Sequence, residues 1–183
     1  MARVLHGCVI KQCSNRGACS KMERKQKGFS IIELLVVVTI ILVIAAVAIP
    51  NLIRSRMSAN EASAVASMRT VLTSEIVYSA TYTVGFAANL TSLSDGGTPS
   101  NCVPPAIPSS SSACLLDSSV ATGTKSGYIF TYLPAAGGSG TASFKLNADP
   151  LTLGSGQRHF FTDDTAVIRA NNTVTASASD PPL

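Results

Sequence analysis

The sequence predicts an α+β protein, in which a long N-terminal α-helix packs on a small antiparallel β-sheet of three or four strands. Three features predict this fold: an apolar segment of 21 residues from Phe29 to Ile49, a continuation from residue 51 to Tyr82 without Gly or Pro, and short strand-like runs near the C-terminus. About 20 apolar residues suffice to cross a bilayer as a helix. The first half of the helix, residues 29–50, is therefore predicted to be transmembrane.

Basic residues precede the apolar segment. Residues 1–28 contain one acid and seven basic side chains: Arg3, Lys11, Arg16, Lys21, Arg24, Lys25 and Lys27. By the positive-inside rule, this segment stays in the cytoplasm and the chain after Pro50 is exported. The whole chain has a formal net charge of +4, but the part after residue 28 has −2, so the basic balance of the whole chain gives no basis for inferring a nucleic-acid contact.

One carboxylate lies inside the apolar segment. Glu33 is the only ionisable residue in this segment. Because a charge at the centre of a bilayer costs roughly 2.5 kcal/mol or more, such a residue usually has a function and a partner. A plain signal anchor, or a secretory signal cut after its apolar core, would account for the length of the segment. Neither alternative explains Glu33 or the Gly28-Phe29 junction that ends the basic region.

The run Gly28-Phe29-Ser30-Ile31-Ile32-Glu33-Leu34, with Ile49-Pro50-Asn51 farther along, resembles the processing and methylation motif of type IV prepilins and the related type II secretion pseudopilins. The resemblance implies that Gly28 ends a leader, residues 1–28, which is recognised by prepilin peptidase. It implies that Phe29 becomes the N-methylated N-terminus. Glu33 would be the carboxylate used in filament assembly.

The position of Glu33 supports that role. It lies four residues after Phe29, about one helical turn, and cleavage would create a positive amine on Phe29. In a filament, the amine of a neighbouring subunit could neutralise Glu33. A buried pair of this kind is weak grounds for stability, but a subunit docked out of register would leave two unpaired charges. The alternative is that Glu33 only extends toward the headgroups.

The leader itself raises two further points. Translation could begin at Met22, because Met22 to Gly28 already forms a short basic leader. Residues 1–21 hold Cys8, Cys13 and Cys19, whose spacing matches no zinc or CxxC pattern.

Residues 51–82 are predicted to continue the helix as an amphipathic segment. Pro50 is expected to kink it, because proline removes one backbone donor and crowds the preceding turn. Apolar residues at three- and four-residue steps form a stripe that should dock on the sheet: Val65, Met68, Leu72 and Ile76. Glu61, Arg69 and Glu75 are predicted to fall largely away from this stripe.

Residues 83–126, rich in Gly, Ser, Thr and Pro, predict a mostly irregular connection. Its two cysteines, Cys102 and Cys114, predict a disulfide in the oxidising exported compartment, with two free thiols as the alternative. Such a bond contributes around 3 kcal/mol in the chain-entropy model.

Residues 127–183 predict the antiparallel sheet and a tail. The expected strands are 128–133, 142–147, 158–162 and 166–170, separated by Gly, Pro and Asp turns. Asp149, Asp163 and Asp164 leave calcium binding open, although the Asp pair also suits a hairpin turn. His159 is expected to be an ordinary surface or core residue. No nucleophile, metal or phosphate-loop motif is present, so no enzyme activity, cofactor or metal is predicted.

Three functions remain open from the sequence. The preferred one is a structural subunit of a type IV pilus, anchored once in the bacterial inner membrane with its C-terminal domain exported, and then assembled into an extracellular homo-oligomeric filament. The resemblance implies prepilin peptidase, an inner-membrane assembly platform and its ATPase as partners. The alternatives are a type II secretion pseudopilin and a membrane-anchored adhesion module that does not polymerise.

Overall fold

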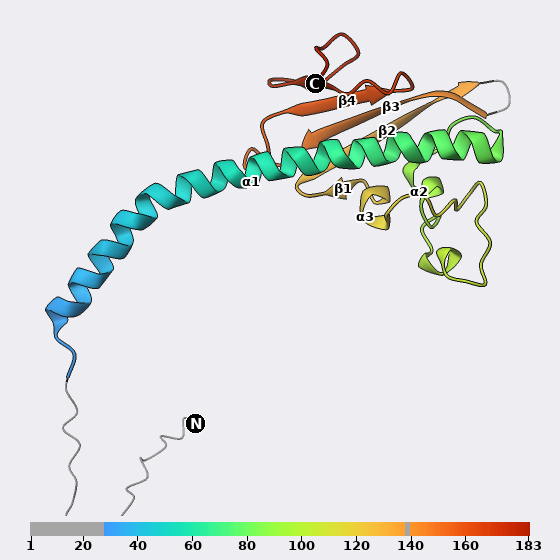
Figure 1. Cartoon of the computed structure of the whole chain (residues 1–183). Helices are drawn as coiled ribbons and strands as arrows, with labels where there is room; N and C mark the ends of the chain where they lie inside the picture. Colours follow the sequence, from blue (N-terminus) through green and yellow to red (C-terminus); the bar gives the residue numbers. More distant parts are fainter. Residues whose placement is uncertain (1–27, 138–139) are drawn as a thin grey trace, which may run out of the picture. The chain divides into compact units, whose positions relative to one another are not determined.

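The structure is a computed structural model that describes residues 28–137 and 140–183 (Figure 1). Most of the predicted leader, with Met22, Cys8, Cys13 and Cys19, lies outside these residues. The chain divides into two compact units at Ala45 and Ala46. One helix, α1, runs from Ile31 to Tyr82 and contributes to both.

The first unit contains the start of α1. Gly28, Phe29 and Ser30 are not helical, and the helix begins at Ile31, two residues later than predicted. The backbone N–H groups of Glu33 and Leu34 donate to Ser30 O at 3.1 and 3.2 Å. The apolar side chains that follow are exposed all round the helix. By length and composition α1 could cross a membrane, and such a uniformly apolar helix requires lipid or other protein around it.

The second unit contains a five-stranded antiparallel sheet with strand order β1-β2-β3-β4-β5. The strands are β1 (Thr124–Lys125), β2 (Tyr128–Gly137), β3 (Gly140–Pro150), β4 (His159–Asp163) and β5 (Arg169–Asn171). The predicted α+β class is therefore confirmed, but three or four strands is too low a count. The short β1 was missed because its two residues lie inside the segment predicted to be irregular.

β4 lies one residue later than the predicted 158–162, and the larger differences in strand boundaries have local reasons. The β2–β3 hairpin extends beyond both predicted runs, since its pairs continue from Tyr128↔Pro150 to Gly137↔Gly140. The last strand begins three residues later than the predicted Ala166. Ala166 has a φ of 60° and its N–H donates to Asp163 O, so it belongs to the turn before β5.

Within the second unit, α1 lies along one face of the sheet (Figure 1). The core between them is built from buried side chains of both: Ala64, Met68, Val71, Tyr78, Tyr128, Phe130, Leu146, Ala148 and Phe160. Full burial of a Met or Val side chain contributes about 1.5–3 kcal/mol. This packing joins helix and sheet into one folding unit.

The predicted docking stripe was only partly right. Met68 and Leu72 are buried, but Val65 is half-buried and Ile76 is 60% exposed. The buried face instead includes both Glu61 and Glu75, which were predicted to fall largely outside it. The face of α1 that packs on the sheet therefore includes Glu61 and Glu75.

The connection between helix and sheet contains three short helices: α2 (Leu90–Leu93), η1 (Pro99–Cys102) and α3 (Ser118–Ala121). Side chains cap two of these helices, α2 and α3, which both lie in the segment predicted to be irregular. Asn89 Oδ1 accepts from Ser92 N at 2.8 Å, and Asp117 Oδ1 accepts from Ser119 N at 3.4 Å. These caps satisfy backbone donors that the helix itself leaves free.

Candidate functional site

The predicted processing junction lies in exposed, non-helical chain. Gly28 and Phe29 precede the first turn of α1, and the Phe29 side chain is 76% exposed. Among the described residues, and apart from Gly28 and its chain neighbours, no atom lies within 4 Å of the position that a Cβ on Gly28 would occupy. A peptidase could therefore reach this peptide bond, while the cleavage itself stays a prediction.

Glu33 lies in the first turn of α1, and its side chain is exposed. A negative charge is favourable there, because the positive end of the helix dipole is at the N-terminus. Within the part of the chain that the structure describes, Glu33 accepts no hydrogen bond and forms no ion pair through its carboxylate. The geometry leaves this carboxylate open to a group from outside the chain.

Pro50 lies inside α1, and the helix is continuous through it. Proline has no N–H, so the carbonyl of Ala46, four residues earlier, loses its usual helical donor. The predicted kink at Pro50 stays a prediction.

Glu75 is fully buried, with no exposed surface. Its Oε2 accepts from Ala87 N at 2.9 Å, and its Oε1 lies 2.7 Å from the Tyr132 hydroxyl. The same hydroxyl lies 2.8 Å from Ala87 O. Glu75 thereby connects α1 to the start of the connection and to β2.

The burial of Glu75 and Tyr132 affects the protonation of both groups. Burial raises the pKa of Glu75, against the opposing effect of the Ala87 N–H and the Tyr132 hydroxyl. Burial and the contact with Glu75 also raise the pKa of Tyr132, so its hydroxyl stays protonated. The Tyr132 hydroxyl can donate to Glu75 Oε1 or to Ala87 O, and when Glu75 is protonated its carboxyl can donate to the Tyr132 oxygen instead.

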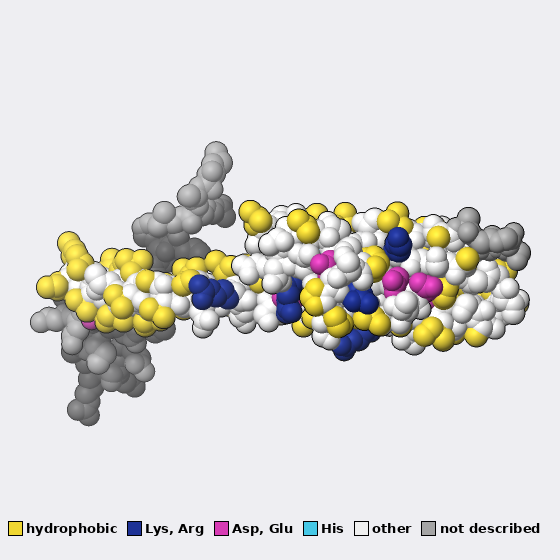
Figure 2. Space-filling view, turned by 90° about the horizontal axis from the view of Figure 1, so that it is seen from above, with side chains coloured by type: hydrophobic (Ala, Val, Ile, Leu, Met, Phe, Trp, Pro, Cys, Tyr) yellow, Lys and Arg dark blue, Asp and Glu magenta, His cyan; other side chains and the backbone are white. Residues whose placement is uncertain are grey.

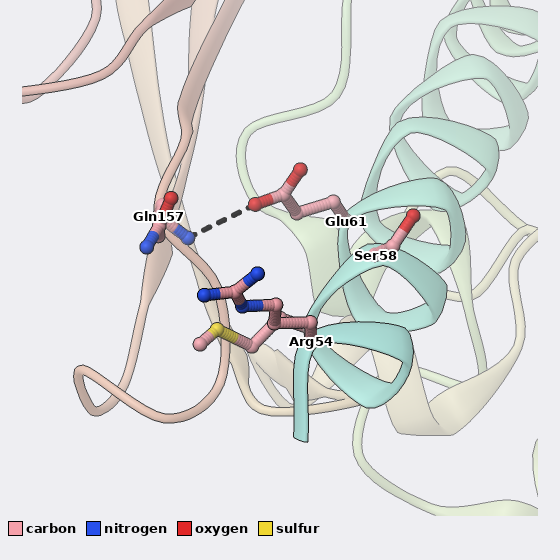
Figure 3. Close-up of a pocket in the computed structure, with 5 residues that line it drawn as sticks. Arg54, Ser58, Glu61 and Gln157 are labelled. Carbon is pink, nitrogen blue, oxygen red and sulfur yellow. Dashed lines mark hydrogen bonds between the residues drawn. The ribbon is translucent and has the colours of Figure 1, made fainter. Parts of the chain in front are cut away.

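Glu61 makes the second buried anchor (Figure 3). Its Oε1 accepts from the backbone N–H groups of Gln157 at 2.9 Å and Arg158 at 3.3 Å, and its Oε2 accepts from Arg158 Nε at 2.9 Å. Burial acts to raise the pKa of Glu61, but these hydrogen bonds and the Arg158 charge together hold the pKa below its usual value. Glu61 therefore stays ionised and holds α1 against the loop between β3 and β4.

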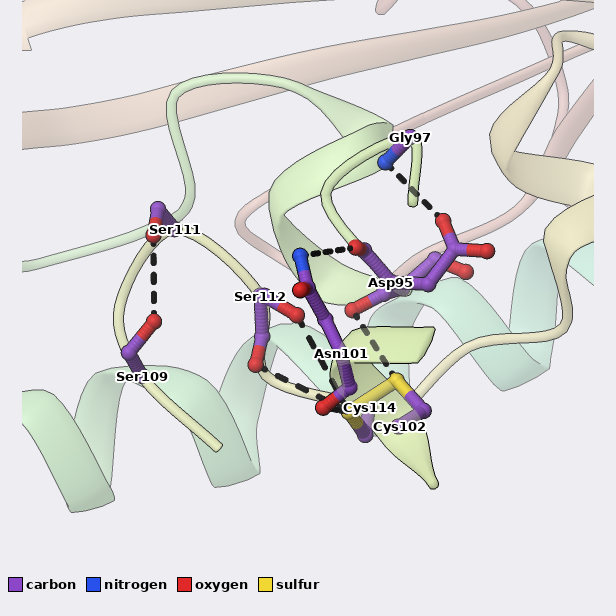
Figure 4. Close-up of a disulfide and its surroundings, with 9 residues drawn as sticks. Asp95, Gly97, Asn101, Cys102, Ser109, Ser111, Ser112 and Cys114 are labelled. Atoms are coloured by element: carbon purple, nitrogen blue, oxygen red, sulfur yellow. Dashed lines mark hydrogen bonds between the residues drawn. A yellow bond between two sulfur atoms is a disulfide. The ribbon is translucent and has the colours of Figure 1, made fainter. Parts of the chain in front are cut away.

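The structure contains the predicted Cys102–Cys114 disulfide, with the two Cα atoms 5.6 Å apart (Figure 4). The enclosed loop also contacts α1, because the Tyr78 hydroxyl donates to Ser110 O at 2.7 Å. Just after the loop, Ser74 Oγ donates to Leu115 O at 3.1 Å. The crosslinked loop is thus held on the helix by side chains of α1.

The three aspartates considered for calcium serve other contacts or lie apart. Asp149 Oδ1 is 2.6 Å from His159 Nδ1, and Asp163 Oδ1 accepts from Thr165 N at 3.1 Å. Residues 28–137 and 140–183 contain no group of three or more His, Cys, Asp or Glu arranged to hold a metal ion. The structure gives the calcium alternative no support.

Sequence reasoning missed the roles of Glu61, Glu75 and Tyr132. The spacing did hold a signal, since Glu75 follows Val71 by four residues and Met68 by seven, the steps of one helix face. The charge of Glu75 outweighed that spacing in the prediction. Its partners, Ala87 and Tyr132, lie too far away in the sequence for a local pattern to identify them.

Comparison with known proteins identifies the N-terminal region. Residues 24–49 match the family described as "Prokaryotic N-terminal methylation motif". The chain is also 41% identical over 81 residues to the type IV wide pilus major component PilA4 of Thermus thermophilus. That match covers 43% of this chain and 61% of the relative, less than two thirds of its length. No solved structure matches the chain. The chain thus carries a prokaryotic N-terminal methylation motif at residues 24–49 and is similar in part to a type IV pilus major component.

Proposed function

We propose that the chain is a structural subunit of a type IV pilus. The similarity to a type IV wide pilus major component carries this proposal, because the name of that protein describes a structural role and filament assembly needs no active site. The exposed apolar surface of residues 31–49 supports it. That surface would lie in the inner membrane before assembly and among other subunits' helices afterwards.

Maturation would occur at the N-terminal junction. Prepilin peptidase would cut after Gly28 on the cytoplasmic side, and Phe29 would then be N-methylated. The exposed, non-helical backbone at residues 28–30 supports access of the peptidase to this bond. An assembly platform with its ATPase would draw the processed subunit out of the membrane.

Assembly would use Glu33 to set the register between subunits. The carboxylate faces outward in a segment whose apolar side chains also face outward. When these helices pack together, Glu33 leaves water and needs a cation within a few ångströms. The new amine of Phe29 on a neighbouring subunit supplies that cation.

The test is to shear extracellular fibres from cells and determine the N-terminal sequence and intact mass of this chain in them. We expect a chain that begins with N-methylated Phe29. Processed chain confined to the cell envelope would instead favour the type II secretion pseudopilin. Unprocessed chain that still carries residues 1–28 would contradict both.

A further inference from the structure

Two arginines follow the apolar segment on the side predicted to be exported. Arg54 and Arg56 lie five and seven residues after Ile49, and both are exposed. Basic residues this close to a membrane span oppose the export of the chain that carries them. The seven basic residues of the leader outnumber these two arginines and still set the orientation of the chain. The position of Arg54 and Arg56 on the exported side is nevertheless unfavourable, so we expect a contact that compensates for it.

Their depth fits the headgroup layer of a bilayer. At 1.5 Å per residue, Arg54 lies about 7.5 Å and Arg56 about 10 Å beyond Ile49 along the helix. The polar layer on each side of a bilayer is about 5–7 Å thick. Helical side chains lean toward the N-terminus of the helix, which here is the direction back to the bilayer. Both guanidinium groups can therefore reach phosphate level.

Arg54 also lines a pocket of about 420 Å³ with Met57, Ser58, Glu61 and Gln157. Figure 3 shows Arg54 extending from α1 into the space between the helix and Gln157. Arg54 brings a guanidinium and Gln157 a side-chain amide to the lining of this pocket, and both groups can donate hydrogen bonds to a phosphate oxygen. Guanidinium groups bind phosphate in a bidentate manner that suits a fixed pocket.

The carboxylate in this pocket does not cancel the positive charge. Glu61 already accepts from Gln157 N, Arg158 N and Arg158 Nε, so its charge is balanced by Arg158. The ion pairs of the described residues involve neither Arg54 nor Arg56. The surroundings of the pocket thus keep a net positive charge, and Figure 2 shows dark blue side chains on the helix where it leaves the globular part.

We propose that Arg54, with Arg56 beside it, binds the phosphate of an anionic phospholipid in the exported-side leaflet of the membrane. This inference rests on the proposed membrane-anchored state of the subunit. The bound lipid holds the processed subunit at a fixed depth, with the globular part resting at the membrane surface. Extraction into a filament then requires release of this headgroup.

The test uses the full chain in phosphatidylcholine vesicles that contain a photoactivatable headgroup probe, either phosphatidylglycerol or phosphatidylcholine. Crosslinked peptides are mapped by mass spectrometry. We expect the phosphatidylglycerol probe to label residues 52–61 and 155–158 several-fold more than the phosphatidylcholine probe. The loss of either arginine should lower this labelling by up to about fivefold, and the loss of both should bring it to the level of the phosphatidylcholine probe. The variants Arg54→Gln and Arg56→Gln, alone and together, test this.

Arg69→Gln is the matched control, because Arg69 is exposed on the same helix about 30 Å beyond Ile49 and out of headgroup reach. Its labelling should equal that of the unmodified chain. Labelling of the basic residues 1–28, present in every variant, reports equal access to lipid. Alkaline extraction tests membrane insertion separately, so failure of the proposed anchoring is distinguished from failure of the lipid site.

Three results would overturn the proposal. The first is equal labelling by the two probes, and the second is unchanged labelling when both arginines are replaced. The third is loss of labelling on addition of millimolar inorganic phosphate, which would assign the pocket to a free anion. Unchanged lipid labelling with reduced filament yield in the double variant would assign the arginines to a contact with a second copy of the chain.

Discussion

The two parts of α1 differ in how they accommodate a carboxylate in apolar surroundings. In the first unit, residues 31–45, the apolar side chains are exposed and so is Glu33. In the second unit, the helix buries one face against the sheet, and Glu61 and Glu75 are buried with it. The first part depends on partners outside the chain, whereas the second part is complete within it.

The difference separates the two acids that have partners within the chain from Glu33, for which we propose a role in assembly. Glu75 receives an amide and a hydroxyl, and Glu61 receives two amides and a guanidinium, all from the same chain. A buried polar group without such partners costs about 1–3 kcal/mol, and a charged group costs more. Glu33 avoids this cost only while it remains in water, at a headgroup or opposite a cation from another chain.

The strongest test of the comparison is Glu33→Ala. We expect the variant to be processed and inserted into the membrane but absent from extracellular fibres, because subunits lose the charge that sets their register. The measurement is the amount of the chain in sheared fibres relative to that in membranes. Thr39→Ala is the matched control, since within the described residues Thr39 Oγ1 bonds only to Val36 O of its own helix, at 2.8 Å. Normal fibre yield with Glu33→Ala would remove the pairing argument.

The next largest effect is expected at Glu75, inside the folded unit. Glu75→Ala should lower the free energy of unfolding by about 3 kcal/mol, because it leaves the Ala87 N–H and the Tyr132 hydroxyl without this acceptor and opens a cavity. Glu75→Gln should cost much less, since its amide oxygen can accept from Ala87 N and its NH₂ can donate to Tyr132. Urea unfolding of the full chain in an uncharged detergent, followed by near-UV circular dichroism, measures both.

A similar loss in the two variants would mean that the charge of Glu75, rather than its hydrogen bonds, stabilises the fold. Tyr132→Phe provides a second check. It removes one hydroxyl and should cost about 1 kcal/mol. Its effect should shrink in the Glu75→Ala background, because the two side chains act on each other.

The comparison of the two parts of α1 also shows which features of the structure can be predicted from the sequence. The apolar segment, the length of the helix and the strand-like runs follow from local pattern, and the structure confirms them as α1 and β2 to β5. The buried acids do not follow, because their burial depends on where the sheet docks around the helix. Arg158 and Tyr132 lie 97 and 57 residues from their acidic partners. At such separations, pairing is decided by the tertiary fold.

Removal of the disulfide tests how much the connection between α1 and the sheet stabilises the second unit. Replacement of both Cys102 and Cys114 by Ser should lower the free energy of unfolding by up to about 3 kcal/mol, because the unfolded chain gains the freedom of an open loop. Ser111→Ala in the same loop is the control, since it removes only an exposed contact with Ser109 at 3.0 Å. Unfolding in urea again measures the change, and an equal loss in the control would point to loop contacts instead of the crosslink.

The smallest expected effect is a pH dependence of opposite sign at the two buried acids. The folded-state pKa of Glu61 lies below its usual value near 4.5, so its stabilisation is present above that pH and is lost as the pH falls through the lower folded pKa. The folded-state pKa of Glu75 lies above 4.5, so its stabilisation is present below that pH and is lost as the pH rises through the higher folded pKa. Glu61→Gln should therefore remove part of the acid-side loss of stability, by about 1 kcal/mol or less because its partner Arg158 is half-exposed. Glu75→Gln should remove part of the loss at higher pH. Unfolding measured between about pH 3 and pH 8 for the two variants gives the answer, and a change of the same sign in both would contradict a lowered pKa for Glu61 and a raised pKa for Glu75.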